Sequence, residues 1–351
     1  MLRDSSSVKD GVDLTTANTL GVQSLAREAF LLDHENQLPD ALAWFRQHPG
    51  AFVLGGGSNV LLVDNSAPPV LLVRLRGRKI SHPATSPTDP VLVSAAAGEN
   101  WHEFVQWTLA QQLYGLENLS LIPGLCGAAP VQNIGAYGVE ISNRVHRVHA
   151  RNLRDGSSHN FSADDCQFGY RDSVFKRQPG QWLITRIELA LSRQPQVILD
   201  YGDIGDELAA HAIKHPTPAD VAQAVCHIRR RKLPDPAVLG NAGSFFKNPV
   251  LSAAETAVLK ARSKDSLAGI AQWPGPNGVV KLAAAALIEA CELKGYRNGD
   301  AGVHEHHALV LVNHGSATGQ QIEALASHIQ EQVNTRFGVW LEPEPVFIRS
   351  A

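Results

Sequence analysis

The sequence feature that most restricts how this chain can fold is a run of three consecutive glycines at residues 55–57. Short apolar segments at residues 51–54 and 60–63 flank the run and predict two strands joined by a glycine loop. Glycine permits positive φ, and without Cβ atoms the backbone N–H groups can close around an anion. Ser58 and Asn59 add side-chain donors. An ordinary tight β-turn is the alternative interpretation of these residues alone.

The glycine loop does not match the common nucleotide-binding motifs. Val60 stands where the third glycine of a dinucleotide fingerprint belongs, and no Gly-Lys-Ser or Gly-Lys-Thr occurs for a Walker loop. A second stretch, residues 122–138, is rich in Gly, Ala, Pro and Asn, which are too small to fill a core but allow close backbone approach to a ligand. A packed irregular loop is the alternative. Two such loops in one chain favour a large diphosphate cofactor.

Bulk properties exclude several classes of protein. A chain of 351 residues is too long for one ordinary core, so we expect two or three domains. The net charge of -3 gives no general attraction to nucleic acid or anionic lipid. Residues 1–10 lack the apolar region of a signal peptide, and no apolar run reaches membrane-spanning length. The four cysteines form no CxxC pair, which favours a reduced, cytoplasmic compartment.

Turn residues and changes of pattern divide the chain into three expected regions, residues 1–78, 79–232 and 233–351, with residues 1–11 as a flexible tail. Strands and helices mix without regular βα alternation, so we expect an α+β fold with mixed sheets. The expected strands are residues 51–54, 60–63, 70–75, 91–97, 145–152, 182–191 and 308–313. The expected helices are residues 38–47, 101–113, 218–232, 255–261 and 279–291, and one that starts after Thr318.

Two helix starts carry strong local signals. Thr217 is the expected N-cap of one helix, with Pro218 at its first position and Asp220 three residues after the cap. Thr318 and Gln321 have the same capping-box spacing.

Five motifs, in this order, resemble the UDP-N-acetylenolpyruvoylglucosamine reductase family over residues from about 18 to 348. They lie at residues 55–60, 122–140, 169–173 (Gly-Tyr-Arg-Asp-Ser), 241–249 (Asn-Ala-Gly-Ser-Phe-Phe-Lys-Asn-Pro) and 341–344 (Leu-Glu-Pro-Glu). The resemblance implies a two-subdomain FAD-binding unit of the PCMH type, shared with vanillyl-alcohol oxidase, followed by a C-terminal α+β substrate-binding domain. The insertion around Tyr201 resembles the longer, type I subclass.

The same resemblance implies a reaction and three catalytic residues. NADPH reduces non-covalent FAD, which then reduces the enolpyruvyl ether of a UDP-sugar. Arg171 would stabilise the enolate-like carboxylate, Glu344 would donate a hydrogen bond as a neutral acid with a raised pKa, and Ser244 would protonate carbon. The residues alone leave other interpretations open: a surface ion pair of Arg171 with Asp172, a surface acid at Glu344, and a turn-capping Ser244. Glu342 is the nearby competitor for the role of Glu344, and only the motif alignment chooses between them.

The cofactor and substrate contacts are carried over residue by residue. The cofactor-binding residues would be Gly55, Gly56, Gly57, Ser58, Asn59, Ile122, Pro123, Gly124, Gly127, Ala128, Gln132, Asn133, Gly135, Ala136 and Tyr137. The substrate-binding residues would be Tyr170, Tyr201, Lys232 and Asn248, with Tyr201 closing over the substrate. An ordinary loop aromatic, a solvated helix end and a turn residue are the alternatives for the last three. Arg229 and Arg230 are interpreted as solvated cations at a helix C-terminus.

The His304-Glu305-His306-His307 run does not predict a metal site. The HExxH motif fails because residue 308 is Ala, and residues 304–307 are expected to enter a strand without a supporting ligand cluster. We therefore expect no metal at this run. We also expect no nucleic-acid partner, no membrane insertion and a monomer. The family often has Gln at the position of His307 and no proline at the position of Pro345. Alternative functions are a flavin oxidase of the same fold acting on an alcohol, and a non-catalytic flavin or nucleotide binder.

Overall fold

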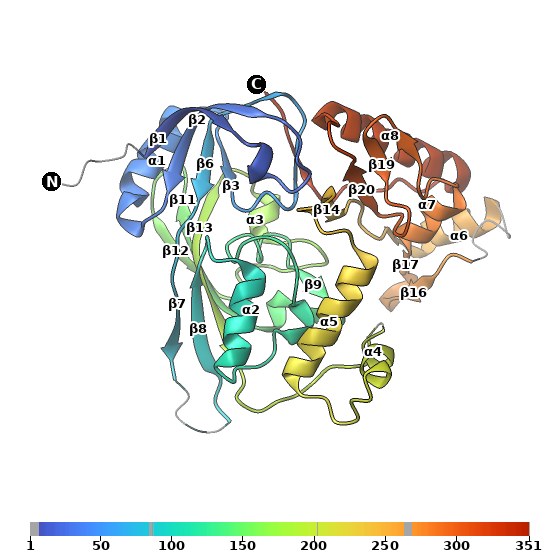
Figure 1. Cartoon of the computed structure of the whole chain (residues 1–351), viewed down its shortest axis with the longest axis horizontal. Helices are drawn as coiled ribbons and strands as arrows, with labels where there is room; N and C mark the ends of the chain where they lie inside the picture. The colour runs from blue at the N-terminus through green and yellow to red at the C-terminus, as the bar shows by residue number, and fades with distance from the viewer. Residues whose placement is uncertain (1–6, 84–85, 87, 202, 263–268, 351) are drawn as a thin grey trace.

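The computed structural model describes the 351-residue chain except residues 1–6, 84–85, 87, 202, 263–268 and 351. The first region is built on a sheet with the strand order β1-β2-β6-β3, in which β2, β6 and β3 run parallel (Figure 1). Its elements are β1 (Val8–Asp13), β2 (Leu25–Leu32), α1 (Leu38–Gln47), β3 (Phe52–Leu54), β4 (Val60–Leu62), β5 (Ser66–Ala67) and β6 (Val70–Val73).

The expectation of a flexible tail over residues 1–11 is wrong for residues 8–11, whereas residues 1–6 lie outside the described part of the chain. These residues belong to β1, which pairs antiparallel with β2, and Val8 packs against the core next to Phe30. The polar pattern of β1 gave no strand signal because most of its residues face solvent at the edge of the sheet.

The second region contains an antiparallel sheet in the order β12-β11-β13-β8-β7. Trp101, Phe104 and Val105 of α2 pack with Val91 and Val148 of this sheet in one buried cluster. The elements are β7 (Arg78–His82), β8 (Val91–Ala96), α2 (Trp101–Ala110), β9 (Gly135–Ala136), β10 (Val139–Glu140), β11 (Val145–Asn152), β12 (Ser158–Phe161), α3 (Val174–Arg177), β13 (Trp182–Leu191), α4 (Ile204–Ala210) and α5 (Pro218–Lys232).

The third region combines a sheet in the order β14-β20-β19-β18 with a three-stranded sheet in the order β15-β17-β16. Its elements are β14 (Gly240–Ser244), β15 (Val250–Leu251), α6 (Ala253–Arg262), β16 (Gln272–Pro274), β17 (Val280–Leu282), α7 (Ala284–Ala290), β18 (Arg297–Asn298), β19 (Ala301–Val303), β20 (Val310–Asn313), α8 (Gly319–Phe337) and β21 (Val346–Ile348). Short 3-10 helices in the three regions span Thr15–Ala17, Glu35–Gln37, Glu117–Leu119, Ile141–Asn143 and Pro276–Gly278.

Two expectations for the third region are wrong. The predicted helix at residues 279–291 begins as β17, which pairs with both β15 and β16, and only α7 is helical. The β-branched Val279 and Val280 favour the strand, whereas the alanines that follow favour the helix. Residues 304–307 do not enter a strand either, because β19 ends at Val303 and β20 begins at Val310.

The capping predictions are confirmed at both helices. Thr217 Oγ1 accepts a hydrogen bond from Asp220 N at 3.3 Å at the start of α5, and Thr318 Oγ1 accepts one from Gln321 N at 3.2 Å before α8. Each pair satisfies backbone N–H groups that the first helical turn leaves without partners.

The last strand returns the chain to the first region. β21 pairs in parallel with β4, which directly follows the glycine loop. One hydrophobic core joins the first and third regions, and α8 contributes Ile322, Ile329 and Val333 to it. The pairing of β21 with β4 therefore fixes the 341–344 motif beside the glycine loop.

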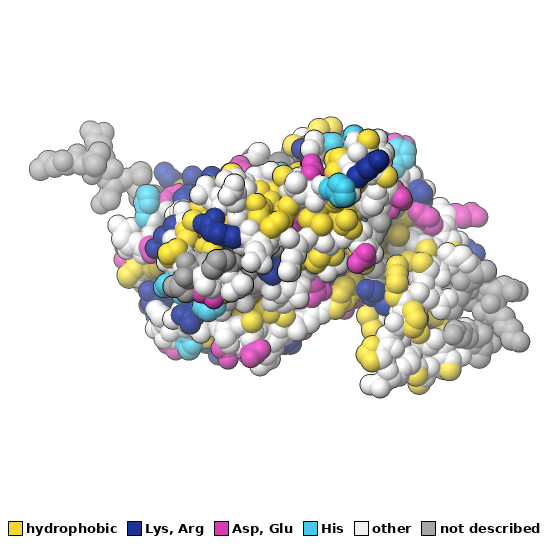
Figure 2. All heavy atoms as spheres, turned by 90° about the horizontal axis from the view of Figure 1, so that it is seen from below, with side chains coloured by type: hydrophobic (Ala, Val, Ile, Leu, Met, Phe, Trp, Pro, Cys, Tyr) yellow, Lys and Arg dark blue, Asp and Glu magenta, His cyan; other side chains and the backbone are white. Residues whose placement is uncertain are grey.

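The surface seen in Figure 2 has no single-sign field. Basic and acidic side chains are scattered over this face, and a hollow separates the larger body from the end of the molecule that carries α6 and β16 in Figure 1. Among the described residues, the structure contains no helix with the length and apolar character needed to span a bilayer.

Candidate active site

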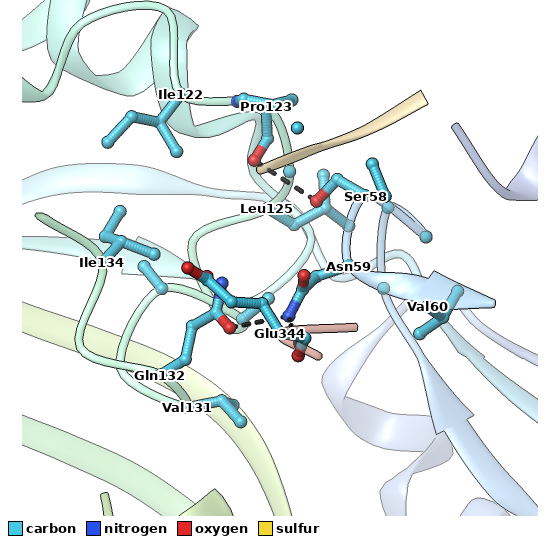
Figure 3. Close-up of a pocket in the computed structure, with 18 of the residues that line it drawn as sticks. Ser58, Asn59, Val60, Ile122, Pro123, Leu125, Val131, Gln132, Ile134 and Glu344 are labelled. Carbon is cyan, nitrogen blue, oxygen red and sulfur yellow. Dashed lines mark hydrogen bonds between the residues drawn. The ribbon is translucent and has the colours of Figure 1, made fainter. Parts of the chain in front are cut away.

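The two loops predicted from small residues face each other across a narrow gap. Gly57 has φ +60°, and a Cβ there would lie 1.9 Å from the carbonyl oxygen of Ala17. Gly124 of the second loop has φ +116°, and a Cβ there would lie 2.7 Å from Ser58 Oγ. Ser58 Oγ in turn donates a hydrogen bond to the carbonyl oxygen of Pro123 at 3.3 Å (Figure 3). Both positions favour glycine because their φ angles are positive, and at Gly57 the neighbouring backbone also leaves no room for a side chain.

Asn59 connects this pair of loops to the C-terminal motif. Its Nδ2 donates to Gln132 Oε1 at 2.6 Å and to the carbonyl oxygen of Glu344 at 3.2 Å (Figure 3). The cavity between the loops has a volume of about 340 Å³, within the range of roughly 300–1,000 Å³ that ligand pockets occupy. The predicted cofactor residues that line it are Gly55, Gly56, Gly57, Ser58, Asn59, Ile122, Pro123, Gly124, Ala128, Gln132 and Gly135.

Four predicted cofactor residues lie away from the lining of this cavity. A Cβ on Gly127 would lie 2.5 Å from Ala97 Cβ, so this glycine serves close packing within the second region. Asn133 is 1% exposed, and its Nδ2 donates to Glu140 Oε2 at 2.7 Å and to the carbonyl oxygen of Gly169 at 3.1 Å. Ala136 lies in the short strand β9. Tyr137 packs against the hydrophobic cluster between α4 and α5.

Arg171 and Glu344 meet at the cavity from different regions of the chain. Arg171 has φ +53°, an uncommon conformation for a residue with a side chain, and its Nη2 donates to the carbonyl oxygen of Gly135 at 3.0 Å. Its Nε lies 3.5 Å from Glu344 Oε2. The alternative ion pair with Asp172 is not what the structure shows, because Asp172 pairs with Arg177.

Glu344 is almost enclosed, with 8% of its surface exposed. Burial raises the pKa of its carboxyl, and the nearby cations Arg171, Lys176 and Lys247 offset part of that rise. The competing acid Glu342 is exposed and pairs with Lys247. The two glutamates of the motif therefore differ in burial, and the buried Glu344 is the candidate for a neutral acid.

Ser244 ends strand β14 and lines the same cavity. The register between β14 and β20 shifts between Asn241 and Ser244, and Gly243 in this interval has φ +70°. Such a bulge redirects the side chain that follows it. Ser244, Arg171 and Glu344, which come from three separate motifs, therefore share one cavity with the glycine loop.

Two cations at this cavity were not predicted as site residues. Lys176 of α3 lines the cavity. Its buried Nζ has no hydrogen-bond partner among the described residues, and burial lowers the pKa of the ammonium group. Arg229 of α5 also lines it, and its Nε donates to the carbonyl oxygen of Leu121 at 3.2 Å. The interpretation of Arg229 as a solvated helix end is wrong, because its side chain points from α5 to the second loop and lines the cavity. Lys176 lies three residues past the 169–173 motif, which is the only sequence signal for it.

Two of the four predicted substrate residues line a second hollow of about 770 Å³. Tyr170 and Asn248 border it together with Trp340. The ring of Tyr170 lies 5.6 Å from Arg171 Cζ, so this hollow adjoins the first cavity. Asn248 is not a simple turn residue, because its Oδ1 accepts a hydrogen bond from Ala284 N at 3.0 Å at the start of α7.

The other two predicted substrate residues lie at the base of the insertion. Lys232 Nζ forms an ion pair with Asp203 Oδ2 at 2.5 Å. Tyr201 is 53% exposed, and Gly138 lies close to it, since a Cβ there would approach Tyr201 Cβ to 3.4 Å. Neither residue lines the cavity that contains Arg171.

The residues present at the first cavity fit a large anionic cofactor. The facing loops offer backbone without side chains, and a Cβ on Gly56 would lie 3.3 Å from Leu125 Cγ in the opposite loop. Lys176 supplies a buried ammonium without a partner in the described structure, and Arg229 supplies a guanidinium. Cations and backbone donors of this kind hold pyrophosphate groups.

Comparisons with known proteins identify the family of this chain. Residues 28–162 match a family described as an FAD binding domain, and residues 235–348 match the C-terminal domain of UDP-N-acetylenolpyruvoylglucosamine reductase. The enzyme of that name from Chromobacterium violaceum is 51% identical over 96% of this chain and 98% of its own length. The one from Pseudomonas aeruginosa is 48% identical over 97% of this chain and 99% of its own length.

A solved structure has the same fold. The crystal structure of the reductase from Thermus caldophilus is similar with a TM-score of 0.66 and 25% identity, over 97% of this chain and 98% of that one. The expected α+β fold with an FAD-binding unit and a C-terminal domain is confirmed by these matches. The chain belongs to the UDP-N-acetylenolpyruvoylglucosamine reductase family.

Proposed function

We propose that this protein reduces the enolpyruvyl ether of UDP-N-acetylglucosamine to UDP-N-acetylmuramate, with FAD as cofactor and NADPH as electron donor. The observation that carries the proposal is that Arg171, Ser244 and Glu344 line one cavity with the glycine loop. Full-length relatives carry the name of this activity. When bound, FAD supplies the ring that takes hydride from NADPH and passes it to the enolpyruvyl double bond.

Arg171 would hold and stabilise the carboxylate of the substrate. A guanidinium stays protonated and can bond both oxygens of a carboxylate, which takes up negative charge as hydride reaches the terminal vinyl carbon. The hydrogen bond from Nη2 to Gly135 O and the left-handed backbone fix the direction of this side chain before substrate binds. The substrate carboxylate would then replace part of the contact between Arg171 and Glu344.

Glu344 would act as a neutral hydrogen-bond donor to the same developing charge. Burial favours the protonated form of this carboxyl, and a buried neutral acid can donate to an oxyanion where a carboxylate would repel it. Its backbone is held on both sides, since Glu344 N donates to Phe245 O at 2.8 Å and Asn59 Nδ2 donates to Glu344 O at 3.2 Å.

Ser244 would donate the proton that completes the addition. Hydride addition leaves a carbanion-like carbon next to the carboxylate, and this carbon is basic enough to take a proton from a hydroxyl. The bulge before Ser244 supports the role because it orients the residue at the end of β14 toward the cavity that Arg171 and Glu344 line.

The anionic groups of the ligands would be held by the surrounding loops and cations. We assign the cofactor pyrophosphate to the loops around residues 55–59 and 122–135, with help from Lys176 or Arg229. We assign the UDP-sugar to Tyr170, Asn248, Lys232 and Tyr201. Lys232 and Tyr201 would have to move toward the cavity, which the half-exposed Lys232–Asp203 ion pair permits at little cost, since such pairs are worth about 0–1 kcal/mol.

Three further points belong to the same proposal: a cytoplasmic location, a monomeric state, and three units at residues 1–78, 79–232 and 233–351. The alternative, an oxidase of the same fold acting on an alcohol, is not favoured by the full-length relatives.

The test separates the two half-reactions of the purified holoenzyme. Bound flavin is reduced with NADPH in the absence of oxygen, and the enolpyruvyl UDP-sugar is then added. We expect reoxidation of the flavin and formation of UDP-N-acetylmuramate. Reduction of the flavin by an alcohol would support the oxidase instead, and the absence of turnover with either substrate would contradict both functions.

A further inference from the structure

The insertion that carries Tyr201 contains a cluster of metal-binding side chains away from the two hollows described above. Glu207 lies on α4, His211 is the C-cap residue of that helix, and His227 lies on α5. One ligand atom from each of the three residues lies within 4.8 Å of the other two. Ile204 and Leu208 of α4 pack against Val225 of α5, so a shared hydrophobic contact fixes the two helices at this point.

Two of the three ligand-to-ligand distances in the cluster match those around a bound ion, and the ligand atoms of the third pair lie within 4.8 Å of each other. His211 Nε2 lies 3.3 Å and His227 Nδ1 lies 3.4 Å from the same oxygen, Glu207 Oε1. Zinc bonds of about 2.0–2.1 Å at tetrahedral angles place neighbouring ligand atoms about 3.3–3.4 Å apart. Two imidazoles and one carboxylate are also a donor set that zinc accepts in proteins.

The Glu207 carboxylate is oriented for metal binding by a contact with Arg231. Arg231 Nη1 bonds the other oxygen, Glu207 Oε2, at 2.7 Å, which leaves Oε1 to the two histidines. The contact with Arg231 therefore fixes the orientation of the Glu207 carboxylate. The Glu207 side chain is 8% exposed, whereas those of His211 and His227 are 52% and 35% exposed. An ion therefore has access from solvent to a ligand that is already oriented by a second contact.

We propose that Glu207, His211 and His227 form a site for zinc or a similar divalent transition metal, with water as the fourth ligand. The metal joins α4 to α5 next to the Asp203–Lys232 ion pair, which connects the same two elements. It thereby holds the base of the segment that carries Tyr201. No sequence motif predicts the site, because His227 reaches Glu207 only after α4 packs on α5.

Zinc binding to the metal-stripped holoenzyme tests the proposal. Equilibrium dialysis against zinc salt in the low micromolar range, with metal counted by mass spectrometry, is expected to give one equivalent per chain. His211→Gln and His227→Gln are each expected to weaken binding at least tenfold, because each removes one of three ligands. Both variants keep the Glu207–Arg231 pair, so the fold of α4 and α5 is preserved. Zinc is also expected to raise the melting temperature of the parent protein and not of these variants.

The chain offers a matched control at its other histidine cluster. His304 and His306 lie 5.6 Å apart between ring centroids, on an exposed loop after β19. The double variant His304→Gln/His306→Gln is expected to keep the bound equivalent. If this variant lost the zinc and His227→Gln kept it, the ion would belong to the loop and the proposal would be wrong. Absence of zinc binding by the parent protein at these concentrations would also overturn it.

Discussion

Arg171 Nε lies 3.5 Å from Glu344 Oε2, although Arg171 belongs to the second region of the chain and Glu344 lies near the end of the third. The contact exists because β21 pairs with β4 and places the 341–344 motif beside the cavity. A permanent cation thus faces a buried carboxyl whose pKa burial raises. In the proposed mechanism, Arg171 offers the substrate carboxylate a fixed positive charge, and Glu344 offers it a hydrogen bond from its protonated form.

Replacing Arg171 by methionine is expected to slow the sugar-dependent half-reaction about 10²–10³-fold, because a charged donor to the developing oxyanion is lost. Reduction of the flavin by NADPH is expected to change far less. Stopped-flow absorbance of the flavin measures both steps. Arg349→Met is the control, since Arg349 also pairs with a glutamate, Glu323, but at the surface. Equal loss of both half-reactions in Arg171→Met would contradict the assigned role.

The pH dependence of the sugar-dependent rate is expected to follow the titration of the Glu344 carboxyl. The residue acts when protonated, so the rate falls as pH rises through its raised pKa. Glu344→Gln keeps an N–H donor but cannot ionise, and it is expected to be slower and to lose this alkaline limb. Single-turnover rates over the pH range measure it. A limb that persists unchanged in the glutamine variant would assign the titration to another group.

Removing the ammonium of Lys176 is expected to move that alkaline limb to higher pH. The cation stabilises the carboxylate form of Glu344, so its loss in Lys176→Met raises the pKa of Glu344 further. Lys294→Met, which removes an exposed cation paired with Glu289 at 3.1 Å, is the control and should leave the limb in place. A shift to lower pH in Lys176→Met would show that the two groups are not coupled as the structure indicates.

Gly57 is expected to be far less tolerant of alanine than Gly180, although both have similar positive φ values of +60° and +69°. Gly180→Ala meets nothing within 4 Å, so its cost is the left-handed backbone alone, about 1–2 kcal/mol. Gly57→Ala would collide with Ala17 O and must displace backbone. We expect a larger loss in the free energy of unfolding and loss of bound flavin for Gly57→Ala. Equal effects in both variants, measured by urea unfolding and flavin absorbance, would refute the packing argument.

Local signals were sufficient to predict much of the fold. The capping residues Thr217 and Thr318 fixed the starts of α5 and α8, because a side chain that satisfies orphan N–H groups acts within four residues. The boundaries of β11 (Val145–Asn152) and β13 (Trp182–Leu191) were also predicted from the apolar pattern. β1 was missed because an edge strand with a polar face has no such pattern.

Long-range packing produced the features that the sequence did not reveal. Arg229 and Arg231 lie in one basic run, yet Arg229 lines the cavity and Arg231 bonds Glu207. The periodicity of α5 alone does not predict which of these cations contacts which neighbouring segment. The ammonium of Lys176, which has no hydrogen-bond partner in the described part of the chain, likewise depends on contacts with distant segments, as does the left-handed backbone of Arg171. The shared cavity of the three catalytic candidates followed only from the motif resemblance, not from spacing.

The most direct test of the central claim is the Ser244→Ala variant, observed in both half-reactions. If Ser244 donates the proton to carbon beside Arg171 and Glu344, NADPH will reduce the flavin at close to the parent rate. Reoxidation by the enolpyruvyl UDP-sugar will be about 10²–10⁴-fold slower, the usual contribution of a positioned acid. Reoxidation at the parent rate, or an equal fall in both steps, would contradict the claim that these three residues act on one substrate in one cavity.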